Sequence, residues 1–266
     1  MSAPGVRVPR TSAPGVFMAV LWRDVFVTGR ELPVFLAQVI LQPLLMLFVF
    51  GKVLANLGYT RPGYTHLLFP GVVALTVLLT ALQSTALPLV LEFSFTKEIE
   101  DRLLAPIPTA LVAVEKMVFA AMRALIAAVC MFPIGVLILG SVPWRAQGAA
   151  EFVVILILGA LVGAAMGLTM GTLVPPSRIS IAFSLVLTPL LFTGCSQYPW
   201  PTLDSLRWFQ IVTLFNPLTY VSEGMRGALV PAVPHMRAWV CVVALVLSLA
   251  LFAAIGIWGF IRRAID

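Results

Sequence analysis

The sequence predicts an all-α integral membrane protein with six transmembrane helices. Of its 266 residues, 61% are apolar and only 11% are charged, whereas soluble domains average roughly 45–50% and 25%. The mean hydropathy is +1.04, and several apolar runs reach the roughly 20 residues with which a helix crosses about 30 Å of hydrocarbon. Six such spans take up about half of the chain or more, which leaves arms and loops but no room for a separate catalytic domain.

The amino-terminal region is predicted to have two parts. Residues 1–16 are rich in Pro and Gly and bury too little apolar surface to order themselves, so we expect a flexible arm. Residues 17–31 follow a helical period, with Trp22 on the apolar side and Arg23 and Arg30 on the polar side. This pattern is typical of an amphipathic helix in the membrane interface. An ordinary extension of the first span explains it equally well.

The spans follow within a single transmembrane domain, residues 17–266. Pro33 is well placed to begin the first span, because proline fits the first turn of a helix. A short turn containing Lys52 is expected after that span, and Pro175 and Pro176 separate the fourth and fifth spans. We expect the six spans at about 33–50, 66–91, 111–139, 152–173, 179–194 and 239–261.

The distribution of Lys and Arg predicts the orientation of the spans. An even number of spans puts both termini on one side, and ten basic residues then fall on that side against six on the other, with Arg123 inside the third span. Cytoplasmic connections are enriched in Lys and Arg, so both termini are expected in the cytoplasm and the chain in the plasma (inner) membrane. The basic residues are scattered at span ends and form no stripe with stacking aromatics, which argues against nucleic acid as a partner.

The fourth span carries a stripe of small residues at every fourth position. Its members are Gly159, Gly163, Gly167 and Gly171. A stripe of this kind lets another helix backbone approach closely, as packing in lipid favours. The approaching helix belongs either to the same chain, which is the favoured interpretation, or to another subunit. In both cases the fourth span is expected to be buried by protein.

Sequence patterns of catalytic, metal or cofactor sites are missing, and we expect none of these sites in this chain. The sequence contains no GxSxG elbow, no HExxH zinc helix and no GxxxxGK[ST] phosphate loop. Its two histidines, His66 and His235, lie far apart in or beside loops. Cys130, Cys195 and Cys241 have neither a CxxC spacing nor the even number of a disulfide framework, and are interpreted as small core residues.

Ionisable residues are nearly absent from the centres of the predicted spans. Glu92, Glu115, Lys116 and Glu151 all stand near span ends. Proton and ion pathways usually keep such a residue inside the membrane. The absence of ionisable residues from the span centres argues against a secondary transporter, which would couple transport to a proton or ion gradient by itself.

A short amphipathic helix is predicted between the second and third spans. Phe95, Ile99 and Leu103 recur at positions i, i+4 and i+8, and the charged residues between and beside them are Lys97, Glu98, Glu100, Asp101 and Arg102. Glu98 and Arg102 form an i,i+4 pair worth about 0.2–0.5 kcal/mol, too little to stabilise so short a helix alone. The apolar stripe therefore packs into the groove of a partner protein or against the ends of the spans.

Three stretches of the chain resemble the permease subunits of type-2 ABC exporters, especially the daunorubicin-resistance and nodulation lipo-oligosaccharide export branch. The first stretch is Phe-Pro-Gly at 69–71. The second is residues 92–99 together with Leu-Leu-Ala-Pro at 103–106. The third lies within residues 193–226 and contains the motifs Thr-Gly, Tyr-Pro, Asn-Pro-Leu-Thr-Tyr and Glu-Gly-Met-Arg. The chain departs from the family at Leu91, where an arginine is common, and at Ser94, where a glycine is common. The charge contacts around Glu92 are therefore expected to differ from those of the family.

The resemblance implies roles for three groups of residues. Residues 95–103 are implied to be the coupling helix that sits in a cleft of an ATPase subunit, and the helix with Trp22, Arg23 and Arg30 is implied to lie against that subunit too. Re-entrant helices within residues 195–236 are implied to form part of an external gate, although a purely structural lid is the alternative. The gate residues are Tyr198, Pro199, Asn216, Pro217, Tyr220, Glu223 and Arg226.

The same resemblance implies a permease of an ATP-driven exporter for a hydrophobic or amphipathic substrate, such as a drug, a lipid or a lipid-linked saccharide. Its partners would be the lipid bilayer, two ABC ATPase subunits and a second permease chain, either identical or related. ATP and magnesium would bind in the ATPase subunits, and this chain would bind no cofactor. The alternatives are a self-contained transporter or channel, and an intramembrane enzyme built on Ser84, Cys195 or Glu223.

Overall fold

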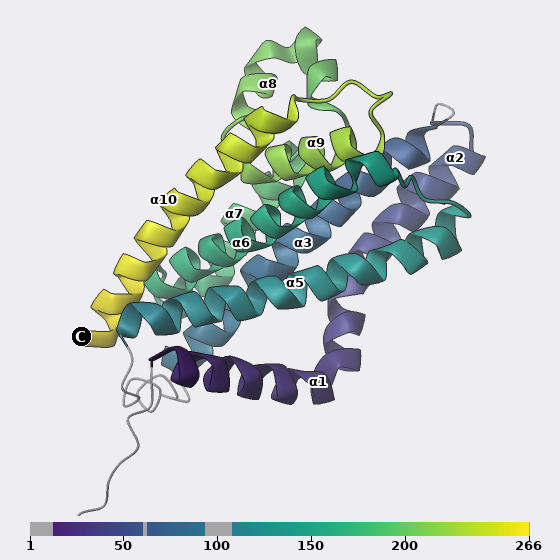
Figure 1. The fold of residues 1–266 in the computed structure, drawn as a ribbon. Coiled ribbons are helices and arrows are strands. Elements are labelled where there is room, and N and C mark those ends of the chain that lie inside the picture. The colour runs from purple at the N-terminus through teal and green to yellow at the C-terminus, as the bar shows by residue number, and fades with distance from the viewer. Residues whose placement is uncertain (1–12, 61–62, 94–107, 266) are drawn as a thin grey trace, which may run out of the picture.

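The computed structural model describes residues 13–60, 63–93 and 108–265, and throughout these ranges the regular structure is helical. The predicted amphipathic helix at 95–103 lies outside the described residues. The long helices run beside one another between two ends of the molecule (Figure 1). We call the end that holds the first turns of α1 and the end of α10 the terminal end, and the opposite end the α8 end. The long helices are α1 (Ala13–Met46), α3 (Tyr64–Leu91), α5 (Thr109–Leu139), α6 (Ala149–Leu173), α7 (Ile179–Thr193) and α10 (Ala238–Ile265).

Six segments of the described chain are long and apolar enough to cross a membrane, as the sequence predicts. They cover Pro33–Asn56, Tyr64–Leu91, Thr109–Leu139, Ala146–Leu173, Pro176–Thr193 and Ala238–Ala264. The fold class is therefore that of an all-α membrane protein. Several spans extend beyond the predicted bounds by a few residues, because helices continue past the apolar core into the polar interface.

The amino-terminal part of the chain differs from the sequence prediction. The helix α1 begins at Ala13, inside the segment expected to be a flexible arm, and it joins the expected interfacial helix and the first span in one element. Figure 1 shows α1 turning through a sharp bend. Pro33 lies inside α1, where its ring removes one backbone hydrogen bond and clashes with the preceding turn, and this is the usual cause of such a bend.

The first span also continues further than predicted. A π-helical segment, η1 (Leu47–Val53), and the short α2 (Leu54–Asn56) extend it through Lys52, which the sequence had suggested lies in a turn. Within η1, Gly51 packs so closely that a Cβ atom there would lie 2.6 Å from Leu139 Cδ2 of α5. The wider π-helical turn thus occurs where the end of the first span meets α5.

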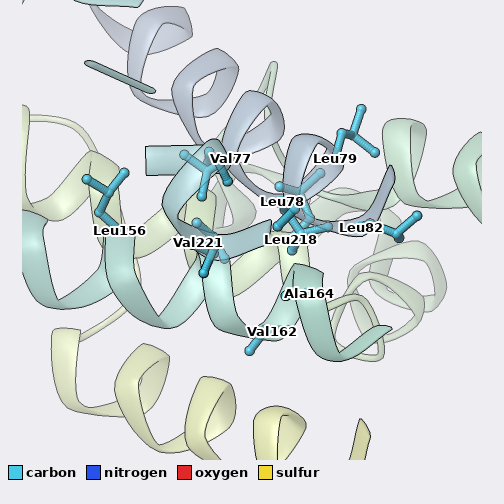
Figure 2. Close-up of a cluster of buried hydrophobic side chains, with 14 of the residues drawn as sticks. Val77, Leu78, Leu79, Leu82, Leu156, Val162, Ala164, Leu218 and Val221 are labelled. Atoms are coloured by element: carbon cyan, nitrogen blue, oxygen red, sulfur yellow. The ribbon is translucent and has the colours of Figure 1, made fainter. Parts of the chain in front are cut away.

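The core forms around α3. Nearly every residue of α3 from Leu68 to Leu82 is buried, because this helix is apolar on all sides and α1, α5, α6 and α9 (Pro217–Leu229) surround it. Figure 2 shows α3 side chains meeting side chains of α6 and α9, among them Val77, Leu78, Leu82, Leu156, Ala164, Leu218 and Val221. The helix α10 packs on the other side of α6.

Short helices fill the segment between the last two spans. They are the 3-10 helix η5 (Trp200–Leu206), α8 (Arg207–Thr213) and α9. Two further 3-10 turns, η3 (Ala146–Gly148) and η4 (Pro176–Arg178), begin the fourth and fifth spans. Two prolines of this segment mark helix starts, since Pro217 occupies the first turn of α9 and Pro199 precedes η5.

Candidate functional site

A buried ion pair joins α3 and α5 at the terminal end. The Nζ atom of Lys116 lies 2.5 Å from Oε1 of Glu92, and the two side chains are only 9% and 11% exposed. Glu92 directly follows α3 and Lys116 lies in the second turn of α5, so the pair joins the end of α3 to the beginning of α5. Charge-assisted hydrogen bonds of this kind are about twice as strong as neutral ones.

A second set of contacts fixes the same corner to α6 and α10. The rings of Phe93 and Phe260 pack edge to face with centroids 5.4 Å apart. The guanidinium of Arg263 lies 4.8 Å from the centroid of the Phe93 ring, and its Nη1 donates a hydrogen bond to the carbonyl oxygen of Gly171 at 2.8 Å. We call Glu92, Phe93, Lys116, Phe260 and Arg263 the anchor cluster. It ties four helix ends together at the base of the segment 94–107.

The remaining residues predicted to face a partner at this end are described only in part. Trp22 is 70% exposed and Arg23 is also exposed on the first part of α1. The side chain of Arg30 is outside the described set, as are all of residues 95–103. The structure therefore describes the helix ends on either side of residues 94–107, while the predicted amphipathic helix and its partner contacts stay predictions.

At the α8 end, a second buried ion pair organises the short helices. Arg226 Nη1 donates to Glu223 Oε1 within α9, and both side chains are completely buried. Glu223 also accepts hydrogen bonds from the backbone N–H of Trp200 at 2.9 Å and of Met236 at 3.0 Å. Arg226 Nη2 donates to the carbonyl oxygen of Cys195 at 2.9 Å. We call these five residues the polar hub.

The polar hub links three separate segments to α9. Cys195 follows α7, Trp200 begins η5 and Met236 precedes α10. The Glu223–Arg226 pair therefore binds both ends of the segment between α7 and α10. Burial raises the pKa of the Glu223 carboxyl, an effect that the charge of Arg226 opposes. Burial likewise lowers the pKa of Arg226, opposed by Glu223. The two charges thus offset much of each other's cost of leaving water.

The start of α3 packs directly against this segment. The backbone of Gly71 lies so close to Ser196 that a Cβ atom on it would be 1.8 Å from the Ser196 carbonyl oxygen. The hydroxyl of Tyr64 donates to the carbonyl oxygen of Gln197 at 3.3 Å. Only glycine fits at position 71. This close packing explains why the Phe-Pro-Gly stretch at 69–71 ends in glycine.

The other predicted gate residues mostly bind backbone groups of the same segment. Asn216 caps α9 by accepting from Leu218 N–H at 2.9 Å, and its amide donates to the carbonyl oxygen of Leu190 at 3.0 Å. Tyr198 and Tyr220 donate their hydroxyls to the carbonyl oxygens of Phe192 at 2.5 Å and Leu214 at 2.8 Å, respectively. Tyr198, Asn216, Tyr220, Glu223 and Arg226 therefore belong to one hydrogen-bonded region around the ends of α7, α8 and α9.

The glycine stripe of α6 packs inside this chain. A Cβ atom on Gly163 would lie 2.5 Å from the Leu78 carbonyl oxygen, and one on Gly167 would lie 2.4 Å from that of Leu82. Gly171 packs against the Leu89 side chain and Gly159 against the Val221 side chain of α9, where a Cβ atom would in each case lie 2.9 Å from the nearest side-chain atom. The stripe is thus the seam between α6 and the helices α3 and α9.

Comparison with known proteins identifies the family of the chain. Residues 15–230 match the family of ABC-2 type transporters. The chain belongs to the ABC-2 type transporter family. The ABC-2 chain is also 27% identical over 216 residues to ycf38 of Cyanophora paradoxa, whose name describes it as a transport permease, and the alignment covers 78% of this chain and 72% of that protein. The chain is therefore a multi-pass membrane permease of an ABC transporter, and its family works with ABC ATPase partners.

Sequence reasoning missed how the charged residues of this ABC-2 permease pair. Leu91 takes the place of an expected arginine, but Lys116 of α5 supplies the positive charge to Glu92 instead. The partnership of Glu223 and Arg226 was also missed, although their i,i+3 spacing within one helix was a usable signal. Arg123 meets an aromatic partner rather than solvent, since its guanidinium lies 4.0 Å from the centroid of the Phe35 ring.

The described residues of the permease offer little to an enzymatic mechanism. No group of three or more His, Cys, Asp or Glu side chains that could hold a metal ion occurs among them. Burial raises the pKa of the Cys195 thiol to about 11, which is the opposite of the activation that a nucleophilic cysteine needs. Glu223 is engaged by three donors, and His235 Nδ1 lies 2.7 Å from the carbonyl oxygen of Val233.

Proposed function

We propose that this chain forms the transmembrane pathway of an ATP-driven exporter for a hydrophobic or amphipathic substrate. The observation that carries the proposal is its membership of the ABC-2 family over residues 15–230, which include five of the six spans. The sequence contains no phosphate-binding GxxxxGK[ST] loop, so ATP and magnesium would bind in a separate ATPase subunit and not in this chain.

The anchor cluster supports a mechanical connection to that ATPase. In the proposed mechanism, residues 95–103 sit in a cleft of the ATPase, and the first part of α1 lies beside them. Since the Lys116–Glu92 pair and the contacts of Phe93 join α3, α5, α6 and α10 at this point, a displacement of the segment 94–107 would move several spans together. Nucleotide binding shifts the balance between inward-open and outward-open states only if the two states bind nucleotide with different affinity.

The α8 end would contribute the external gate. The polar hub holds η5, α8 and α9 as one unit, and Gly71 connects that unit to α3. With both termini in the cytoplasm, as the basic residues predict, this unit would face the outside. A gate on α3 could then respond to the movement of the anchor cluster at the other end of the same helix.

A second permease chain is part of the proposal. The fifth span presents large apolar side chains outward, and Ile181, Leu185 and Phe192 are 62%, 69% and 66% exposed. Exposed apolar surface of this extent on a span is covered by lipid or by another membrane helix. Two permease chains would enclose the pathway and two ATPase subunits would drive it.

The test is reconstitution of the permease with and without its ATPase. In sealed vesicles, we expect ATP-dependent extrusion of a fluorescent hydrophobic drug by the complex, and no extrusion by the permease alone or by a complex whose ATPase lacks its phosphate-loop lysine. Uphill transport by the permease alone would contradict the proposal and favour a self-contained transporter.

A second experiment addresses the coupling role of residues 95–103. Reversing both charges, with Glu98→Lys and Arg102→Glu, is expected to abolish transport while membrane insertion continues. The matched control is Arg145→Glu, a charge reversal at an exposed position near the opposite end of the spans. Unchanged transport by the Glu98 and Arg102 variant would exclude docking through this helix.

A further inference from the structure

The last span, α10, turns one long face away from the rest of the molecule. It runs along an edge of the bundle (Figure 1), and its other face, with Cys241, Leu245 and Phe260, is buried in the contacts with neighbouring helices. The exposed face begins at Trp239 and ends at Trp258, which are 63% and 56% exposed. The exposed residues between these two tryptophans are all apolar: Val243, Val246, Leu247, Ala250, Leu251 and Ala254.

The length of this exposed face matches the thickness of a bilayer. At a rise of 1.5 Å per residue, the helix advances about 28 Å from Trp239 to Trp258, and the hydrocarbon core of a bilayer is about 30 Å thick. Tryptophan is enriched at both membrane interfaces, because its ring has an apolar body and a polar N–H group. A helix face with tryptophan at each end and only apolar residues between them is typical of contact with lipid. Trp258 then lies at the level of the head groups at the terminal end.

Arg262 continues the same face beyond Trp258. It lies one turn further along α10, and its guanidinium is 5.6 Å from the centroid of the Trp258 ring. A cation–π contact of this kind holds the guanidinium beside the ring and leaves its N–H groups available to an acceptor. Within the described residues, the exposed guanidinium of Arg262 makes no hydrogen bond or ion pair. Its neighbour Arg263, by contrast, is bound to Gly171 in the anchor cluster.

The charges around Arg262 favour a negatively charged partner. At the terminal end, the exposed charged side chains of the described residues are all positive, and they are Arg23, Arg178 and Arg262. The described carboxylates of this end, Glu92 and Glu115, are both buried. The described part of the chain therefore offers Arg262 no exposed carboxylate, and the complementary negative charge must come from another molecule.

We propose that Trp258 and Arg262 bind the phosphate group of an anionic phospholipid in the leaflet at the terminal end, while its acyl chains lie along Leu247 and Leu251. A guanidinium can donate two parallel N–H bonds to one phosphate. A zwitterionic lipid carries its own cation beside the phosphate, and that cation competes with Arg262, so a lipid with a net negative charge is preferred. The lipid is a bound partner of the chain and not its transported substrate. The inference therefore rests on the membrane fold and not on the proposed function.

The test measures lipid binding to the full chain in detergent, with phosphatidylglycerol or phosphatidylcholine of identical acyl chains. Native mass spectrometry counts the lipids that stay bound, and we expect the unmodified chain to retain about fivefold more phosphatidylglycerol, the effect of one arginine near an anionic head group. Arg262→Gln is expected to abolish this preference, and Arg262→Lys to keep part of it, because lysine has the charge without the planar fork.

The matched control is Arg145→Gln, which removes one exposed charge at the α8 end. The preference of this variant is expected to stay within about twofold of the unmodified chain, because a charge so far from Arg262 is screened. Equal retention of the two lipids by the unmodified chain would overturn the inference. Equal losses in the Arg262→Gln and Arg145→Gln variants would reduce it to attraction by net charge. Displacement of the lipid by millimolar inorganic phosphate would show a site for a free anion instead.

A second measurement distinguishes lipid from a second copy of the chain on this face. Ala254→Cys places a thiol on the exposed face, one turn before Trp258. In vesicles treated with copper phenanthroline, we expect this variant to form no more disulfide-linked dimer than the unmodified chain, because lipid separates this face from other copies. Efficient cross-linking of Ala254→Cys would assign the face to a contact between two permease chains and would overturn the inference.

Discussion

At the residue scale, the charges of this permease are concentrated at the two ends of the bundle. Glu92 and Lys116 pair at the terminal end, and Glu223 and Arg226 pair at the α8 end. A buried charge is tolerated only when it is paired and hydrogen-bonded, so each pair constrains the segments that supply its other hydrogen bonds. These residues therefore position the chain rather than react.

The Glu223–Arg226 pair gives the first prediction. Replacing one partner, as in Glu223→Gln or Arg226→Met, is expected to lower the free energy of unfolding by about 3–5 kcal/mol, because the other charge is left buried without its partner. The double variant is expected to lose less than the sum of the two single losses. Unfolding in detergent, followed by the fluorescence of the tryptophans, measures all four proteins of this cycle. Additive losses would show that the two side chains act independently.

Cys195 gives a second prediction at this scale. Its thiol is buried, and burial raises its pKa from 9.0 to about 11. Since thiolate is the reactive form, its alkylation at pH 8 is expected to be roughly a hundredfold slower than that of an ordinary cysteine. The rate should rise tenfold per pH unit up to about pH 11. Maleimide labelling of a variant with Cys130→Ala and Cys241→Ala, compared before and after unfolding, measures this difference, and rapid labelling of the folded protein would contradict the buried placement.

The backbone at Cys195 explains why sequence reasoning could not find its role. Its φ angle is 51°, the only positive φ at a non-glycine residue in the described ranges. This conformation is uncommon for a residue with a side chain. The Cys195 carbonyl oxygen accepts from Arg226, which helps to hold it. A strained backbone fixed by a residue 31 positions away leaves no local pattern in the sequence.

At the element scale, the spans could be predicted from the sequence, but which spans pack against one another could not. Apolar run length sets the number and approximate place of the spans, and the described part of the chain has six helical segments long and apolar enough to be spans. The continuity of α1 through Pro33 was one of two alternatives that the sequence left open, because proline occurs at a helix start as well as at a bend. The choice of α3 as the central helix depends on which apolar faces meet. Its hydropathy lies within the range of the other spans and is not the highest, so hydropathy alone does not identify it as the central helix.

The seam between α6 and α3 gives the third prediction. Gly167→Ala would put a Cβ atom 2.4 Å from the Leu82 carbonyl oxygen and 2.8 Å from Thr85 Cβ, so the helices must move apart. Overpacking of this kind is expected to cost about 1–3 kcal/mol of stability. Ala150→Val adds more volume at an exposed position of the same helix and is expected to cost less than about 0.5 kcal/mol. The melting temperatures of the two variants in detergent provide the comparison, and equal values would refute the close contact.

At the scale of the whole molecule, α3 connects the two candidate sites. Its first turns meet the α8 end through Gly71 and Tyr64, and its last residue precedes Glu92 of the anchor cluster. Because α3 is buried along most of its length, a force applied at one end reaches neighbouring helices along the whole span. A permease that responds to an ATPase at one end and opens at the other needs such a connection.

The charge pair at the base of α3 gives the fourth prediction. Reversing one charge, with Glu92→Lys or Lys116→Glu, puts like charges into contact at a site that is about one-tenth exposed. Each single reversal is expected to lower the amount of drug extruded per ATP hydrolysed at least tenfold in vesicles that hold the full complex, because repulsion separates α3 from α5 where the segment 94–107 leaves them. The double variant restores an opposite-charge pair and is expected to recover coupling to within about threefold of the unmodified complex. If the exchanged pair restores stability in detergent but leaves transport uncoupled from ATP hydrolysis, the pair serves only the fold, and the connection from the ATPase to α3 must run through other residues.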